Sequence, residues 1–376
     1  MIESLGRGGA EHHLTDLLPI LARRGVESEV ASLMTPYDLA PALEERGIPV
    51  HRIDLPHRWH APGAVRRLLG TIAAVRPDLI HAHLFFGTLY VALTRPFAPR
   101  PRRVVQLHNL DYEIYPAYTA WRRARRAIHR LALRYGMDAR IAYARAVALH
   151  YAELRPGPID TVPLGIDPGA VADPLDRSAV RRRQGVGPED VWIVVPGRFV
   201  RQKGHRVMVE ALVALRRQGL RPRVLMVGGG PLEEDIRDLI RACDLAGQVT
   251  LSRAVPHPEL MDLLRAADLV VVPSLQEGSA LVVYEALLAG TAVVATAVGG
   301  TPDVVASGST GLLVPPGDPE ALSRAIARLS EDPTERARLG AGGRDLILTE
   351  HSLEAEAAGF LRLYGRVLGK ASQDGQ

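Results

Sequence analysis

Cysteine and lysine are almost absent from this 376-residue chain. Because Cys243 is the only cysteine, an internal disulfide and a cysteine-rich metal site are excluded, and a reducing compartment, by default the cytoplasm, is favoured. The best candidate for a membrane span, 286–302, contains three glycines and falls short of the ~20 apolar residues needed, so we expect a buried helix followed by a buried strand. The glycine-rich first ten residues lack the apolar segment of a signal peptide.

The composition is that of a globular protein with unevenly distributed charge. Apolar residues make up 47% and charged residues 23%, which excludes a disordered chain, and the length predicts two domains of roughly 150–200 residues. Up to Gly185 there are 26 basic and 18 acidic residues, and after it 20 and 24. The basic half favours an anionic partner, such as a membrane surface, a phosphorylated acceptor or nucleic acid.

Short runs of Val, Ile and Leu alternate with helical stretches throughout the chain, the pattern of parallel sheets covered by helices. A glycine turn at 6–9 leaves only residues 1–5 for an opening strand, which is barely enough. Segment 167–187 indicates a linker with a short basic helix. Predicted strands are 29–33, 50–54, 78–84, 103–108, 139–142, 161–164, 192–196, 223–227, 249–252, 269–273, 292–295 and 311–314; helices are predicted at 11–24, 320–329, 334–348 and 352–367.

Two doubly wound α/β domains follow from this repetition. In such sheets ligands bind at the carboxyl ends of the strands. Each motif considered next directly follows a predicted strand, so all of them would line one cleft if the two sheets face each other.

Glu277 and Glu285 straddle a predicted strand-to-helix turn, with the helix starting near Ser279. Their separation favours separate roles, one carboxylate near a reacting centre and one accepting hydrogen bonds from ligand hydroxyls. The free N–H groups of Gly278, Ser279 and Ala280 would bind an anion. Taken alone, the two glutamates would be better explained as a solvated loop residue and an exposed helical residue.

Two cations, Arg198 and Lys203, follow the first strand of the second domain, and Gly197 and Gly204 allow sharp turns beside them. The planar guanidinium and the compact ammonium could together hold a diphosphate. An exposed basic loop is the alternative interpretation.

These segments belong to an ordered set that spans nearly the whole chain. The set is Gly8-Gly9-Ala10-Glu11, His83, His108, Pro196-Gly197-Arg198, Lys203-Gly204, Val227-Gly228-Gly229-Gly230-Pro231, Glu277 to Glu285, and Val298-Gly299-Gly300-Thr301-Pro302. It resembles the retaining glycosyltransferases of family 4, whose fold is GT-B. The resemblance implies an acceptor-side Rossmann-like domain at 1–170, a linker at 171–187, a nucleotide-sugar domain at 188–351, and a final helix, 352–370, that packs back on the first domain.

The implied function is sugar transfer, with retention, from a nucleotide-diphosphate-sugar to a glycan, lipid-linked or small-molecule acceptor in polysaccharide or glycoconjugate biosynthesis, without cofactor or metal. The resemblance places the diphosphate on Arg198 and Lys203, the ribose on Glu285, the donor sugar beside Glu277 and His108, and the acceptor near His83. The implied catalytic residues are Glu277, His108, Arg198 and Lys203; the implied nucleotide-binding residues are Gly8, Gly9, Arg198, Lys203, Gly228, Gly278, Ser279, Ala280, Leu281 and Glu285.

Other features have simpler interpretations. His81, His83 and His108 lack a nearby carboxylate signature and are a poor metal site. The basic amphipathic stretch 121–135, with a second basic-aromatic patch at 57–69, fits either an anionic membrane surface or a solvated face. No nucleic-acid-binding module is present. A nucleotide-sugar epimerase and a noncatalytic partner of another transferase remain alternatives to the transferase.

Overall fold

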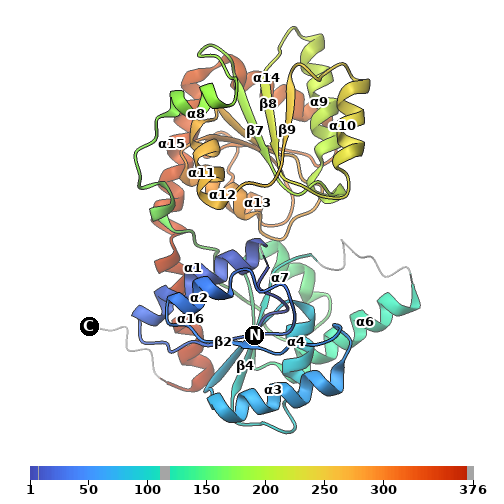
Figure 1. The fold of residues 1–376 in the computed structure, drawn as a ribbon, viewed down its shortest axis with the longest axis vertical. Helices are drawn as coiled ribbons and strands as arrows, with labels where there is room; N and C mark the ends of the chain where they lie inside the picture. The colour runs from blue at the N-terminus through green and yellow to red at the C-terminus, as the bar shows by residue number, and fades with distance from the viewer. Residues whose placement is uncertain (7, 111–118, 371–376) are drawn as a thin grey trace. The chain divides into compact units, whose positions relative to one another are not determined.

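The computed structural model describes residues 1–6, 8–110 and 119–370, and the chain forms two α/β units (Figure 1). The first unit consists of Met1–Gly165 together with the segment from Leu353 onward, and the second of Ile166–Ser352. The segment expected as a linker, 171–187, belongs to the second unit. There the short basic helix α8 (Arg177–Arg183) packs on α11 (His257–Ala266), and Arg181 pairs with Asp268 at 2.9 Å.

The first unit contains two parallel sheets instead of the single sheet expected. The opening strand predicted at 1–5 is wrong, because only Ile2 forms a bridge, to Ser32. Ile2 N–H donates to Ala31 at 2.9 Å, and the carbonyl of Met1 accepts from His83 at 2.9 Å. These two residues therefore connect the short sheet β1-β2 to the sheet β3-β4-β5-β6. The strands are β1 (Val30–Ser32), β2 (Val50–Arg52), β3 (Leu79–His83), β4 (Arg102–Leu107), β5 (Ala139–Ala142) and β6 (Asp160–Thr161).

The basic stretch expected as one helix, 121–135, changes its winding part-way. The α-helix ends at Leu131 and continues as a π-helical turn, Ala132–Gly136. The carbonyls of Leu133 in this turn and of Met137 just after it accept from the buried guanidinium of Arg140 at 2.5–2.9 Å. The helices of the first unit are α1 (Gly9–Arg23), α2 (Ala40–Glu45), α3 (Ala61–Val75), α4 (Leu84–Leu93), α6 (Ala120–Leu131), α7 (Arg145–Ala152) and α16 (Leu353–Leu368).

The last helix, α16, is part of the first unit and lies beside α1 (Figure 1). Its fully buried Glu356 binds His13 of α1 at 2.9 Å and accepts from the N–H of Gly165 at 2.7 Å. Burial alone would lower the pKa of His13, but the Glu356 carboxylate outweighs burial and raises it above 6.5. A charged pair thus links the two helices, although they are more than 300 residues apart in sequence.

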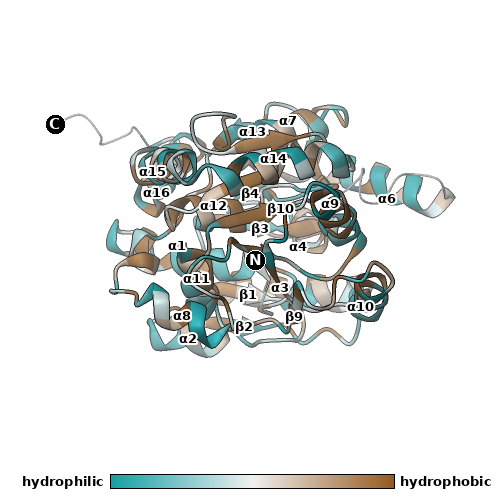
Figure 2. Cartoon of the chain, turned by 90° about the horizontal axis from the view of Figure 1, so that it is seen from above, coloured by the Kyte–Doolittle hydropathy of each residue, from teal (hydrophilic) through white to brown (hydrophobic). Residues whose placement is uncertain are grey.

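The second unit is built on one six-stranded parallel sheet, in the order β12-β11-β10-β7-β8-β9. Its central strands are continuous apolar runs because helices cover both faces of the sheet, and they appear brown in Figure 2. The apolar stretch 286–302 is divided between the end of α12, the buried strand β11 and a short helix, α13. The strands are β7 (Trp192–Pro196), β8 (Arg223–Val227), β9 (Val249–Ser252), β10 (Leu269–Val272), β11 (Ala292–Thr296) and β12 (Leu312–Val314).

Two helices of the second unit begin where an aspartate side chain satisfies an N–H group of the first turn. Asp318 accepts from Ala321 at 2.8 Å and Asp332 from Glu335 at 2.8 Å, and each cap is followed by a proline. Besides α8 and α11, these helices are α9 (His205–Arg217), α10 (Glu233–Ala242), α12 (Leu281–Leu288), α13 (Thr301–Val304), α14 (Pro319–Glu331) and α15 (Pro333–Glu350).

Candidate active site

In the second unit, the loops after β7 and β10 are joined. Leu275 N–H donates to the carbonyl of Gln202 at 2.7 Å. Gly204 has φ +65°, and a Cβ there would lie 1.9 Å from the carbonyl oxygen of Pro273, so only glycine fits. This contact brings the lysine loop against the carboxylate loop, two motifs that the sequence analysis treated separately.

Lys203 and Glu277 form an ion pair at this junction. Lys203 Nζ lies 2.5 Å from Glu277 Oε1, and the hydroxyl of Ser274 donates to the same oxygen at 2.6 Å. The two side chains are 21% and 11% exposed, so the pair is largely shielded from water. Lys203 is therefore not an unpaired cation here, but its ammonium has three donors, and two of them remain for a ligand. Sequence reasoning missed the role of Ser274 in orienting Glu277.

Arg198 lies at the start of the same β7 loop, which is packed against the glycines that follow β8. A Cβ on Gly228 would lie 2.0 Å from the carbonyl oxygen of Gly197, so the close approach of the loops after β7 and β8 requires glycine at position 228. Phe199 N–H donates to Gly229 at 2.9 Å and fixes the loop. The Arg198 side chain is exposed and has no hydrogen-bond or ion-pair partner in the part of the chain that the structure describes, which leaves its guanidinium available to an anion.

The carboxylate motif begins its helix two residues later than predicted. Ala280 is the N-cap of α12, which starts at Leu281, and the N–H groups of 278–280 find no acceptor among the described residues. Gly300 N–H donates to the carbonyl of Gly278 at 2.7 Å and so holds the turn from the β11 side. The later start keeps these amides in an extended turn instead of a helical one, where they can still converge on an anion.

Glu285 lies within α12, and its carboxylate has a partner that the sequence analysis did not name. His257, the first residue of α11, places Nε2 2.8 Å from Glu285 Oε1. The Glu285 side chain is only 6% exposed and that of His257 is 38% exposed. A signal for this pair was present in the sequence only as a histidine after a strand, between two prolines.

The candidate residues of the first unit gather at the carboxyl ends of β3 and β4. His83 Nδ1 and His108 Nε2 are 3.0 Å apart. Burial lowers the pKa of His108 to about 3 and, together with the charges of His81 and His108, lowers that of His83 well below 6.5. Both imidazoles are therefore neutral near pH 7, and one donates to the other.

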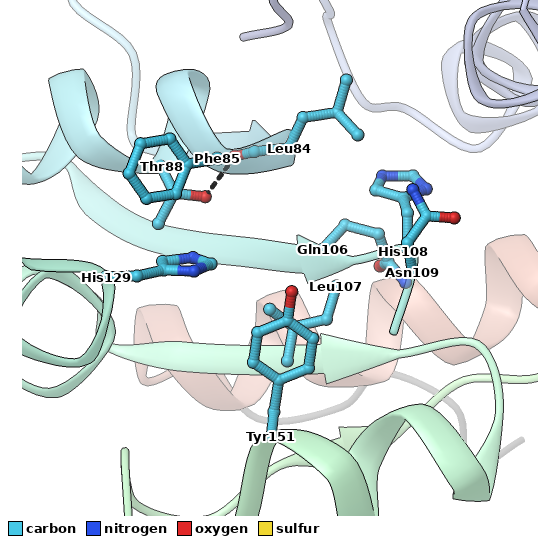
Figure 3. A pocket seen from close by; sticks show the side chains of 9 residues that line it. All are labelled: Leu84, Phe85, Thr88, Gln106, Leu107, His108, Asn109, His129 and Tyr151. Carbon is cyan, nitrogen blue, oxygen red and sulfur yellow. Dashed lines mark hydrogen bonds between the residues drawn. The ribbon is translucent and has the colours of Figure 1, made fainter. Parts of the chain in front are cut away.

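A small pocket lies at the same end of β4 (Figure 3). Gln106, His108 and Asn109 line it from the strand and its following loop. Gln106 is 1% exposed, and neither its amide oxygen nor its amide nitrogen has a partner among the residues described. A polar residue inside the run Val-Val-Gln-Leu was a signal that sequence reasoning missed. The cavity, about 10 Å³, has room for one water, which could satisfy the Gln106 amide.

The glycine loop of the first unit leads directly into α1. Gly8 is the N-cap of α1 in an extended conformation, its carbonyl accepts from His12, and Gly9 is exposed as the first helical residue. A Cβ on Gly8 would lie 2.3 Å from the Glu11 carboxylate. The Glu11 carboxylate thus already lies beside this helix terminus, and the expected contact of Gly8 and Gly9 with a phosphate stays a prediction.

Neither a metal cluster nor a membrane-spanning helix is found across 1–6, 8–110 and 119–370. No three His, Cys, Asp or Glu side chains there are arranged to hold an ion. No helix in these ranges is long and apolar enough to cross a bilayer. The site in the second unit thus combines two cations, unbonded amides and two carboxylates with separate partners, which is a set suited to a phosphorylated, hydroxyl-rich ligand.

Comparison with known proteins identifies the family. Residues 7–170 match the model of Glycosyltransferase Family 4, and residues 176–346 match that of Glycosyl transferases group 1. The chain is 31% identical over 304 residues to the 2-deoxystreptamine glucosyltransferase of Streptomyces kanamyceticus, an alignment that covers 78% of each chain. It is 33% identical over 365 residues to the D-inositol 3-phosphate glycosyltransferase 1 of Catenulispora acidiphila, covering 89% of this chain and 85% of the relative.

The chain belongs to glycosyltransferase family 4. Among solved structures, Anabaena HepE in complex with UDP-glucose matches with a TM-score of 0.84 at 22% identity, covering 97% of this chain and 98% of that one. The predicted GT-B fold of this family 4 glycosyltransferase is thereby confirmed.

Proposed function

We propose that this family 4 enzyme transfers a sugar, with retention and without a divalent metal or other cofactor, from a nucleotide-diphosphate-sugar to a hydroxyl of its acceptor. The observation that carries the proposal is the junction of the β7 and β10 loops, where Lys203 meets Glu277 at 2.5 Å; the exposed Arg198 belongs to the same β7 loop. A diphosphate would bridge the two cations, with the sugar beside Glu277.

The chemistry needs charge stabilisation more than a dedicated base. As the bond between the anomeric carbon and the diphosphate breaks, negative charge grows on the leaving phosphate, which Arg198, Lys203 and the amides of 278–280 would stabilise. The acceptor hydroxyl forms its new bond on the same face of the sugar, and its proton passes to the departing phosphate oxygen. In the first unit, neutral His108 and the unpaired amide of Gln106 would orient hydroxyl groups.

The relatives indicate which acceptors to assay first. The two relatives named above act on 2-deoxystreptamine and D-inositol 3-phosphate, both six-membered cyclitols, and we propose cyclitols as the first acceptors to assay.

We also propose that the enzyme works in the cytoplasm, with α6 against an anionic membrane surface. Exposed Trp121, Arg123 and Arg130 on this helix support docking, and much of the helix has the colour of hydrophilic residues in Figure 2.

A ligand screen followed by product analysis tests the function. UDP, GDP and ADP are compared by thermal shift, because a ligand at about 100 times its Kd stabilises the folded state by about 2.7 kcal/mol. The stabilising nucleotide's sugars are then incubated with each cyclitol, with and without EDTA, and the product's anomeric configuration is determined by NMR. No stabilisation, an inverted product or loss of activity in EDTA would contradict the proposal. Donor binding without transfer to any acceptor would favour the noncatalytic alternative, and donor consumption that releases nucleoside diphosphate without acceptor product would favour an epimerase.

A further inference from the structure

The contact between His257 and Glu285 has features of a prepared ligand site. Glu285 is surrounded by buried apolar residues of α12, where an ionised carboxylate is costly unless it is hydrogen-bonded. Its Oε1 binds His257 Nε2 at 2.8 Å, whereas its Oε2 has no hydrogen-bond partner in the described ranges. A carboxylate can accept about four hydrogen bonds, so most of its capacity is open.

Proline residues constrain the backbone on both sides of His257. His257 stands between Pro256, the N-cap of α11, and Pro258 within the first turn. Proline fixes its own φ and restricts the residue before it, so both neighbouring backbone segments are constrained. The backbone that carries the ring is therefore restricted before any ligand arrives, and the hydrogen bond from Nε2 to Oε1 limits the rotation of the Glu285 carboxylate. Its 38% exposure shows that the ring borders solvent instead of filling the core.

We propose that His257 is a positioning residue for nucleotide binding: it holds the Glu285 carboxylate so that the open lone pairs accept the vicinal hydroxyls of the ribose. The inference rests on the proposed function, because it requires a nucleotide in the second unit. It adds a residue to the site and predicts that discrimination between ribose and deoxyribose depends on a side chain that does not itself touch the sugar.

The test compares nucleotides that differ only in these hydroxyls. The Kd values of UDP, 2′-deoxy-UDP and 2′,3′-dideoxy-UDP, or of the GDP series if only GDP binds, are measured by calorimetry for the wild type, His257→Ala and His257→Gln. We expect His257→Ala to weaken the ribonucleotide about 10-fold, the scale of one hydrogen bond to a charged group, and the dideoxynucleotide less than about 2-fold. Since Gln can donate from a similar position, His257→Gln should recover most of the loss.

A matched control comes from the first unit. His51 binds the Glu29 carboxylate with Nε2 at 2.5 Å, and the two side chains are 34% and 36% exposed, so His51→Ala removes a histidine–glutamate pair whose histidine is about as exposed as His257, without touching the site. This variant should leave all three Kd values and kcat unchanged, whereas His257→Ala should raise the donor KM with kcat retained. Equal weakening of ribo- and dideoxynucleotide by His257→Ala, or no weakening, would overturn the inference while leaving the proposed function standing. Failure of the wild type to bind any nucleoside diphosphate would instead overturn both.

Discussion

Replacing Lys203 by Met separates two tasks of this residue: holding Glu277, which the structure shows, and binding the diphosphate, which we propose. The substitution removes the ammonium and keeps most of the aliphatic chain. It leaves the Glu277 carboxylate, 11% exposed, with the Ser274 hydroxyl as its remaining hydrogen-bond donor. Glu277→Gln is the complementary change, and the double variant closes a thermodynamic cycle on a pair that is 2.5 Å apart.

The expected stability loss follows from the burial of the pair. Breaking a buried ion pair by removing one partner costs about 3–5 kcal/mol, and the 21% exposure of Lys203 places this pair near the lower limit. With about 2–4 °C per kcal/mol for a unit of this size, Lys203→Met should lower the Tm of the second unit by roughly 6–12 °C. Glu277→Gln leaves a cation that can reach water, so the loss should be about 1 kcal/mol. The double variant should regain most of the Tm lost in Lys203→Met.

Nucleotide binding should respond differently, and this contrast is the test. UDP affinity, measured by calorimetry, should fall in Lys203→Met and stay low in the double variant, because the ammonium is absent from both. Glu277→Gln should bind UDP at least as tightly as the wild type, since a competing negative charge is gone. If the double variant recovers UDP affinity together with Tm, Lys203 acts only by orienting Glu277 and the diphosphate role is refuted.

Three further predictions concern other parts of the molecule. Arg198→Ala should weaken UDP binding far more than binding of the free sugar, with exposed Arg201→Ala as the matched control; equal losses would argue against the diphosphate contact. The pKa of His13 is raised in the folded state, so its pair with Glu356 stabilises the first unit fully below pH 6.5 and loses this contribution as pH rises through the folded pKa. The Tm of His13→Gln should therefore lie below that of the wild type at pH 6, and the difference should shrink towards pH 9. Sedimentation of the protein with anionic liposomes should fall steeply as the salt concentration rises. It should be lost when Arg123 and Arg130 of α6 are replaced by Glu, but not when exposed arginines of α8 are replaced in the same way. Sedimentation that does not depend on salt would reject docking through α6.

The strands of the second unit could be predicted closely because each is a continuous apolar run between polar turns. The predicted 192–196, 223–227 and 249–252 coincide with β7, β8 and β9, and 139–142 in the first unit coincides with β5. The opening strand failed for a physical reason that was visible in the sequence. The glycine turn left too few residues, and the structure uses Met1 and Ile2 as a short connection between two sheets.

The partners of the charged residues could not be predicted, since they depend on which loops meet in space. Glu277 and Lys203 are 74 residues apart, and Glu285 and His257 are 28 apart. Strand periodicity places each of these residues at the carboxyl edge of the sheet. It says nothing of the close approach of Gly204 to Pro273, which decides that the lysine reaches the carboxylate.

The charge balance of the donor site favours the products of the proposed reaction over its substrates. Arg198 and Lys203 equal Glu277 and Glu285 in number, so these four residues together carry no net formal charge. An intact nucleotide-sugar therefore meets a site whose ammonium is shared with Glu277. When the glycosidic bond breaks, the leaving diphosphate gains negative charge and competes better for that ammonium. Lys203 can then shift its donors toward the phosphate while Ser274 retains Glu277, so its interaction strengthens as the transition state is approached, which is the requirement for acceleration beyond simple binding.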